Sequence, residues 1–156
     1  MSYLFVVISY LIGSINFAYL VAKYKKLDIS SSGSGNPGTS NVMRTIGKKY
    51  AAIVLIGDVF KGFIPIFLFD ENLLLCGFAA VIGHIYPIFY KFKGGKGVAT
   101  YIGVYIAFST LNPISYDLFE NSYFLFLNIP VLAIFYFVVF KISRISAIAS
   151  LLTVFI

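Results

Sequence analysis

Long apolar stretches alternate with shorter polar segments along the chain. The apolar stretches cover residues 3–22, 50–69, 72–90, 98–111 and 122–140, and another begins after Arg144. A helix needs about 20 apolar residues to cross the hydrocarbon core of a bilayer. The pattern therefore predicts five complete membrane-spanning helices, the fourth somewhat short and the fifth kinked by Pro130, followed by part of a sixth.

Composition supports a membrane protein. Of the 156 residues, 60% are hydrophobic and 12% are charged, with a mean hydropathy of +0.92. A soluble domain carries about 25% charged residues, and a disordered chain needs low hydrophobicity. We therefore expect an all-α, polytopic transmembrane bundle in which residues 1–156 form a single integral membrane domain.

Charge is distributed unevenly between the polar segments. Of the 12 basic residues, 11 lie in the first, third and fifth segments: Lys23, Lys25, Lys26, Arg44, Lys48, Lys49, Lys91, Lys93, Lys96, Lys141 and Arg144. The segments between them contain Asp70, Glu71, Asp117 and Glu120. By the positive-inside rule, the N-terminus lies outside and residues 27–49 and 91–97 face the cytoplasm. The net charge of +6 then reflects topology, and no nucleic-acid partner is expected.

The polar segment 27–49 contains the string SGSGNPGTSN at residues 32–41, followed by Arg44. Glycine and asparagine tolerate positive φ, so successive backbone N–H groups can form an anion-binding concavity. An arginine adds a bidentate donor. The alternative is a flexible, solvated connector, which is typical of Gly/Ser-rich sequence.

The segment 91–97 joins glycines and lysines at the start of a predicted helix. Glycines allow close approach of the backbone to a phosphate, and a helix N-terminus adds N–H groups and positive potential. The segment does not match the nucleotide-binding pattern G-x-x-x-x-G-K-[ST], because Tyr90 and Gly97 stand at two of its defining positions. We therefore expect phosphate binding without nucleotide chemistry. The alternative is a basic turn that only fixes topology.

Four polar residues inside apolar stretches need an explanation. Asp58 and Lys61 share one helical face, and charges at membrane depth are usually paired. They either neutralise each other and lock the bundle, or Asp58 orients a substrate-binding base. His84 either packs between helices or faces the phosphate loop. Asn16 is expected to form an interhelical hydrogen bond.

Neither a metal nor another cofactor is expected. Cys76 is the only cysteine and His84 the only histidine, and four of the six acidic residues lie on the predicted outer side. This leaves no cytoplasmic carboxylate cluster for Mg²⁺.

With these motifs in view, the sequence resembles the integral-membrane glycerol-3-phosphate acyltransferases that use acyl phosphate as donor, the PlsY family. The first family motif resembles SGNPGTSN at residues 34–41 with Arg44, and the second resembles GHIYPIFYKFKGGKGVAT at residues 83–100. Shorter similarities are GSI at residues 13–15 and DVFKG at residues 58–62.

The resemblance implies transfer of a fatty acyl group from acyl phosphate to the sn-1 hydroxyl of glycerol 3-phosphate, giving lysophosphatidic acid and phosphate. It implies a multi-pass protein of the bacterial inner membrane, in contact with membrane lipid and without a cofactor or metal. We expect a monomer. The alternative function is a small transporter or an anion-binding membrane subunit with a phosphate-binding cytoplasmic loop.

Site residues follow from the same resemblance. The implied catalytic residues are Ser34, Arg44, His84, Lys96 and Ser143. The implied substrate-binding residues are Asn36, Gly38, Asn41, Lys93, Gly94, Gly95, Gly97 and Thr100. Ser143 is the weakest of these, because Arg144 stands near the position of the family's serine. The family has about seven helices and a third motif near its C-terminus, so this chain is expected to be incomplete at that end.

Overall fold

The computed structural model describes residues 2–110, all of its regular structure being helical. The chain divides into two compact units, Met1–Val104 and Tyr105–Ile156, and the site motifs lie in the first. The predicted helix at 122–140, the partial sixth helix and Ser143 lie outside the described residues.

The first apolar stretch forms two helices, where the hydropathy pattern predicts one. Helix α1 covers Ser2–Ser14 and α2 covers Phe17–Tyr24. Asn16 lies between them with extended backbone angles, and its side-chain oxygen accepts a hydrogen bond from the Tyr19 amide at 3.1 Å. Asparagine is among the best N-cap residues. The single predicted helix is therefore wrong, because Asn16 starts a new helix in the middle of the span.

The next polar segment contains a short helix that composition did not predict. Helix α3 covers Thr39–Thr45 and is followed by α4, Lys48–Leu68. Gly47, at φ 118°, makes the turn between them, a conformation that glycine adopts without steric cost. The predicted helix at 50–69 is confirmed with small shifts of its ends.

The second predicted motif begins in the last turn of a helix that ends early. Helix α5 covers Leu73–Ile85, and a 3-10 turn, η1, covers Ile88–Tyr90. Pro87 disfavours the helical conformation of Tyr86 and lacks an amide hydrogen, so α5 stops before it. Helix α6 then covers Val98–Thr110, close to the predicted 98–111.

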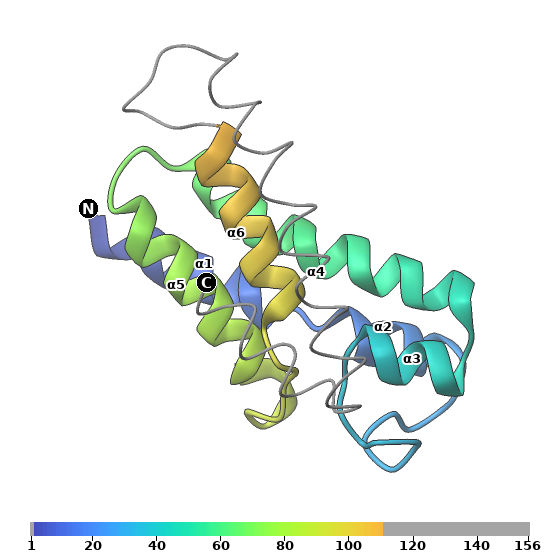
Figure 1. Cartoon of the computed structure of the whole chain (residues 1–156). Coiled ribbons are helices and arrows are strands. Elements are labelled where there is room, and N and C mark those ends of the chain that lie inside the picture. Colours follow the sequence, from blue (N-terminus) through green and yellow to red (C-terminus); the bar gives the residue numbers. More distant parts are fainter. Residues whose placement is uncertain (1, 111–156) are drawn as a thin grey trace, which may run out of the picture. The chain divides into compact units, whose positions relative to one another are not determined.

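Glycines allow the helices to pack with their backbones in contact. Helices α1 and α5 lie side by side (Figure 1). A Cβ added at Gly13 would collide with the Ala80 carbonyl oxygen, and one at Gly83 would lie 2.9 Å from the Ser14 amide nitrogen. A Cβ at Gly62 of α4 would likewise collide with the carbonyl oxygen of Thr100 in α6. Small residues at such contacts are characteristic of membrane helix packing.

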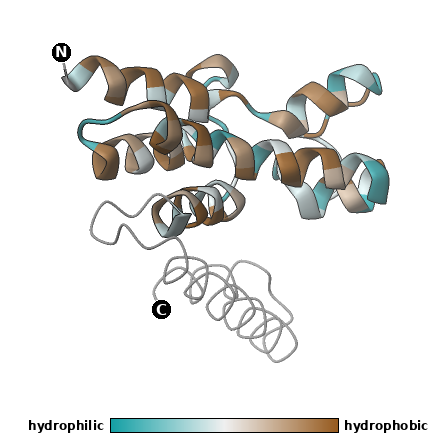
Figure 2. Cartoon of the chain, turned by 90° about the horizontal axis from the view of Figure 1, so that it is seen from above, coloured by the Kyte–Doolittle hydropathy of each residue, from teal (hydrophilic) through white to brown (hydrophobic). Residues whose placement is uncertain are grey.

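Large apolar side chains cover the outside of these helices. Three described segments, Tyr3–Tyr24, Lys48–Leu68 and Leu73–Tyr90, are long and apolar enough to cross a membrane. Figure 2 shows the hydrophobic residues running along the helices. Leu74 and Phe78 of α5 are 76% and 66% exposed. Such a surface is suited to lipid and not to water.

The close packing at Gly13 gives a first prediction. Alanine favours a helix over glycine by about 1 kcal/mol, but at position 13 its methyl group meets the backbone of α5. We expect Gly13→Ala to destabilise the full-length protein by about 1–3 kcal/mol, as overpacking does. Thermal unfolding in detergent measures this, with Val7→Ala on the exposed side of α1 as control. A rise in stability for Gly13→Ala would contradict the contact.

Candidate active site

The first motif loop folds around the side chain of Asn41. This residue is 1% exposed, and its amide oxygen accepts a hydrogen bond from the Ser34 backbone at 2.9 Å. Its amide nitrogen donates to the carbonyls of Ser32 and Ile29, at 2.9 and 3.4 Å. A Cβ at Gly33, where φ is +59°, would collide with the Asn41 side chain. Asn41 therefore organises the loop from inside, and its expected role in substrate binding stays a prediction.

A second set of hydrogen bonds shapes the start of this loop. The Asp28 carboxylate accepts from the side chain and amide of Ser30, at 2.6 and 2.9 Å. These bonds, with the Ser30 hydroxyl contributing most, hold the pKa of Asp28 below its usual value. The Asp28 carbonyl accepts from the hydroxyls of Ser31 and Ser32. The Gly/Ser-rich segment is thus a folded loop and not a flexible connector.

The second motif loop lies directly against the end of α5. The amide of Gly95 donates to the His84 carbonyl at 3.1 Å. A Cβ at Gly94 would collide with the same carbonyl oxygen, and one at Gly95 would collide with His84 Nε2. Gly97 adopts φ +80° and passes close to Ile85. These glycines are therefore required by the packing of the protein itself.

The two motif loops meet at Pro37 and Gly95. An added Cβ on Gly95 would lie 3.2 Å from the Pro37 carbonyl oxygen. The same oxygen accepts a hydrogen bond from Asn16 Nδ2 at 3.4 Å. Nearby, the rings of Tyr19 and Tyr90 stack with centroids 4.6 Å apart. The structure thus brings together loops that are more than fifty residues apart in the chain.

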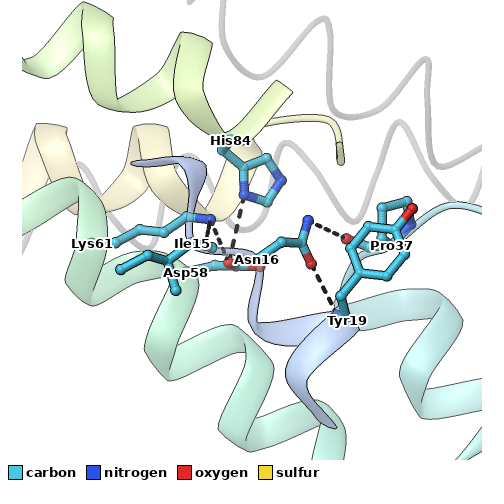
Figure 3. Close-up of polar contacts among 7 residues, drawn as sticks. All are labelled: Ile15, Asn16, Tyr19, Pro37, Asp58, Lys61 and His84. Atoms are coloured by element: carbon cyan, nitrogen blue, oxygen red, sulfur yellow. Dashed lines mark hydrogen bonds and ion pairs between the residues drawn. The ribbon is translucent and has the colours of Figure 1, made fainter. Parts of the chain in front are cut away.

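A buried charged cluster lies beside this junction (Figure 3). Asp58 Oδ1 is 3.0 Å from Lys61 Nζ and 3.5 Å from His84 Nδ1. Asp58 and Lys61 are 1% and 2% exposed, and His84 is 3% exposed. Lys61 Nζ also donates to the Ile15 carbonyl at 2.6 Å. The predicted pairing of Asp58 with Lys61 is confirmed, and His84 belongs to the same cluster.

The remaining predicted site residues fall into two groups. The exposed ones are Ser34, Arg44, Lys93 and Lys96, and Asn36 and Gly38 are partly exposed. Partial burial lowers the pKa of Lys96 below that of an ordinary lysine. Thr100, in contrast, is fully buried against Gly62, and its hydroxyl has no hydrogen-bond partner among the described residues.

This arrangement suits the binding of phosphate esters. Cationic and hydroxyl side chains are exposed next to loops whose shape is fixed by buried contacts. Between residues 2 and 110, no three His, Cys, Asp or Glu side chains come together as metal ligands would. The chemistry available here is charge neutralisation and positioning.

Sequence reasoning missed the connecting role of Asn16. It was expected to hydrogen-bond between helices, but it caps α2 and reaches the first motif loop instead. The signal was present, because an asparagine directly before an apolar run is a helix start signal. The uninterrupted hydropathy of residues 3–22 concealed it.

The enclosed amide of Asn41 gives a second prediction. Asn41→Ala leaves the Ser34 amide and the Ser32 carbonyl without their partner, which costs about 1–3 kcal/mol. We expect lower thermal stability of the full-length protein and faster proteolysis within residues 27–38. Ser40→Ala, at an exposed neighbour on α3, is the control. If both variants resist protease equally well, Asn41 does not organise the loop.

Comparison with known proteins identifies the family. A family model described as glycerol-3-phosphate acyltransferase matches residues 3–156. The glycerol-3-phosphate acyltransferase of Aquifex aeolicus is 48% identical over 67% of this chain and 58% of its own length. That of Methylobacillus flagellatus is 50% identical over 69% of this chain and 58% of its own length. The chain thus spans just over half the length of these relatives.

Solved structures agree with the sequence comparison. The crystal structure of PlsY, an integral membrane glycerol 3-phosphate acyltransferase, in its glycerol 3-phosphate form has a TM-score of 0.76 and 35% identity, covering 97% of this chain and 72% of that one. Its lysophosphatidic acid form has a TM-score of 0.69 and 36% identity, covering 97% and 71%. The predicted all-α membrane bundle is confirmed, and this chain belongs to the glycerol-3-phosphate acyltransferase family of multi-pass integral membrane proteins.

Proposed function

We propose that the full-length protein transfers a fatty acyl group from acyl phosphate to the sn-1 hydroxyl of glycerol 3-phosphate. The observation that carries this proposal is the contact between the two motif loops at Pro37 and Gly95. This contact joins the backbones of the two loops, which supports a single site formed by both of them. Solved relatives in glycerol 3-phosphate and lysophosphatidic acid forms support the same substrate and product.

In this reaction, the sn-1 hydroxyl oxygen attacks the carbonyl carbon of the acyl phosphate. The bond from that carbon to the phosphate oxygen breaks, inorganic phosphate leaves, and the hydroxyl proton goes to phosphate or water. Because the donor is already activated, the protein has to align the reactants and neutralise negative charge on the phosphates. No covalent acyl-enzyme and no cofactor is needed.

The two loops divide this work. We assign glycerol 3-phosphate to the second loop, with Lys96 and Lys93 supplying charge and Gly94–Gly97 the backbone surface. We assign acyl phosphate to the first loop, where Ser34, Asn36 and Arg44 are accessible beside Gly38. Ser143 stays a prediction outside the described residues, and Thr100 supports the packing of α6 on α4.

The charge pattern supports a location for this chemistry. The basic segments that contain both loops face the cytoplasm of a bacterial inner membrane, and the N-terminus lies outside. Acyl phosphate is amphiphilic, so its chain reaches the site from the bilayer while glycerol 3-phosphate arrives from water. A monomer is sufficient for this arrangement.

Removal of the Lys96 charge tests the proposal. Membranes that carry the full-length protein are given radiolabelled glycerol 3-phosphate and palmitoyl phosphate, and lysophosphatidic acid is measured. We expect Lys96→Ala to lose activity by about a hundredfold or more, the scale of losing one preorganised electrostatic contact. Lys91→Asn is the matched control, because Lys91 is an exposed lysine of the same loop with φ 53°, which asparagine tolerates.

Two results would reject the acyltransferase proposal. One is the absence of lysophosphatidic acid with the wild-type protein, and uptake of glycerol 3-phosphate without acylation would instead indicate a transporter. The other is equal activity of Lys96→Ala and Lys91→Asn.

The lowered pKa of Lys96 gives a pH prediction. A lysine binds phosphate through its protonated form, so activity is retained below its pKa and lost as pH rises through it. We expect the alkaline loss of kcat/KM to lie below the pH at which an ordinary lysine titrates. Lys96→Arg keeps the charge at all accessible pH values, so it moves this loss to higher pH. A pH profile that is identical in both proteins would show that Lys96 is not the titrating group.

A further inference from the structure

We propose that a positioning network sets the distance between the two motif loops, across the break between α1 and α2. The network consists of Asn16, Asp58, Lys61 and His84. The inference rests on the proposed function and assigns these residues no contact with substrate. It concerns how two loops from distant parts of the chain are held at a fixed position relative to each other. Figure 3 shows the network reaching from His84 to Pro37.

The break in the first span creates the position at which the network begins. In a continuous helix, the Tyr19 amide would bond to the Ile15 carbonyl, four residues earlier. Here that amide bonds to the Asn16 side chain instead. The Ile15 carbonyl receives Lys61 Nζ at 2.6 Å. A lysine from α4 thus replaces the missing helical hydrogen bond, and its positive charge is favourable at the end of a helix.

Asn16 connects this break to the first loop. Its oxygen caps α2, which orients the amide so that Nδ2 donates to the Pro37 carbonyl. Asn16 is fully buried, and Pro37 is buried as well. Both ends of a single amide group are therefore used, one to start a helix and the other to hold the loop.

His84 connects the cluster to the second loop. Its Nδ1 faces Asp58, while an added Cβ on Gly95 would collide with Nε2. The His84 carbonyl also accepts the Gly95 amide at 3.1 Å. With the ring 3% exposed and Nε2 against the loop backbone, His84 acts through Gly95. This is a positioning role, where the sequence motif had implied a catalytic one.

Asp58 connects the contacts to the first loop with the contacts to the second loop. Its Oδ1 contacts Lys61, which leads to the first loop through Ile15 and Asn16. The same oxygen atom contacts His84, which leads to the second loop. If Asp58 and Lys61 only neutralised each other's charge, removal of both charges would leave the stability of the protein unchanged or raise it. If the pair positions the loops, removal of both charges leaves the Ile15 carbonyl without its donor and replaces the carboxylate that faces the His84 ring with a weaker, neutral acceptor.

The first experiment separates these roles in the full-length protein in membranes. Thermal stability, kcat and KM for both substrates are measured for Asp58→Asn, Lys61→Met and the double variant. We expect both single variants to be unstable and the double variant to regain much of the wild-type stability. Its kcat should remain lower by about tenfold to a hundredfold, because misplacement of reactants by about 1 Å costs that much.

Val54→Ala is the matched control. Val54 is a fully buried residue of the same helix, one turn before Asp58, and its apolar side chain packs in the hydrophobic core without a polar contact. We expect lower stability with unchanged kcat and KM per folded molecule. A double variant that regains both stability and kcat would overturn the positioning network. Absence of activity in the wild-type protein would instead reject the proposed function.

A second experiment tests the His84 arm independently of the charges. Gly95→Ala places a methyl group against the imidazole and should lower kcat/KM strongly. We expect the double variant Gly95→Ala with His84→Asn, which removes the end of the ring and keeps an amide near the Nδ1 position, to be more active than Gly95→Ala alone. Additive losses in this cycle would show that the two residues are not coupled and would overturn the inference for His84.

Discussion

The rest of the site depends on the burial of the Asp58 carboxylate. A charge at membrane depth is costly unless it is paired, and Asp58 is 1% exposed in a predominantly apolar span. Its partners come from α4 itself and from α5. Helices α4 and α5 therefore cannot slide or rotate independently without separating the Asp58 carboxylate from the His84 ring. Through Lys61 the same constraint extends to the end of α1.

Glycine contacts make this network geometrically possible. Because Gly13 and Gly83 let the backbones of α1 and α5 touch, and Gly62 does the same for α4 and α6, the side chains have only short distances to cover. Helices in lipid gain little from hydrophobic association, so close van der Waals contact and internal hydrogen bonds hold them together. The glycine contacts bring the helices close together, and the polar network then connects them.

Hydropathy predicted the helices in which the backbone runs without a break. The expected 50–69 and 98–111 correspond to α4, Lys48–Leu68, and α6, Val98–Thr110. It failed at Asn16, where a single residue starts a new helix, whereas the proline at position 87 correctly predicts the end of α5. The motif composition located both loops, but the enclosed Asn41 amide and the contact of His84 with Gly95 depend on tertiary geometry. No local pattern encodes them.

In the second loop, the same glycines suit both close packing of the backbone and close approach of a phosphate. Gly94, Gly95 and Gly97 were interpreted from sequence as residues that let a phosphate approach the backbone. In the structure, a Cβ at Gly94 or Gly95 already meets the end of α5 without any ligand. The Gly95 amide is also occupied, because it donates to the His84 carbonyl. In the proposed site, the phosphate contacts at this loop therefore come from the lysine side chains and from backbone amides other than that of Gly95.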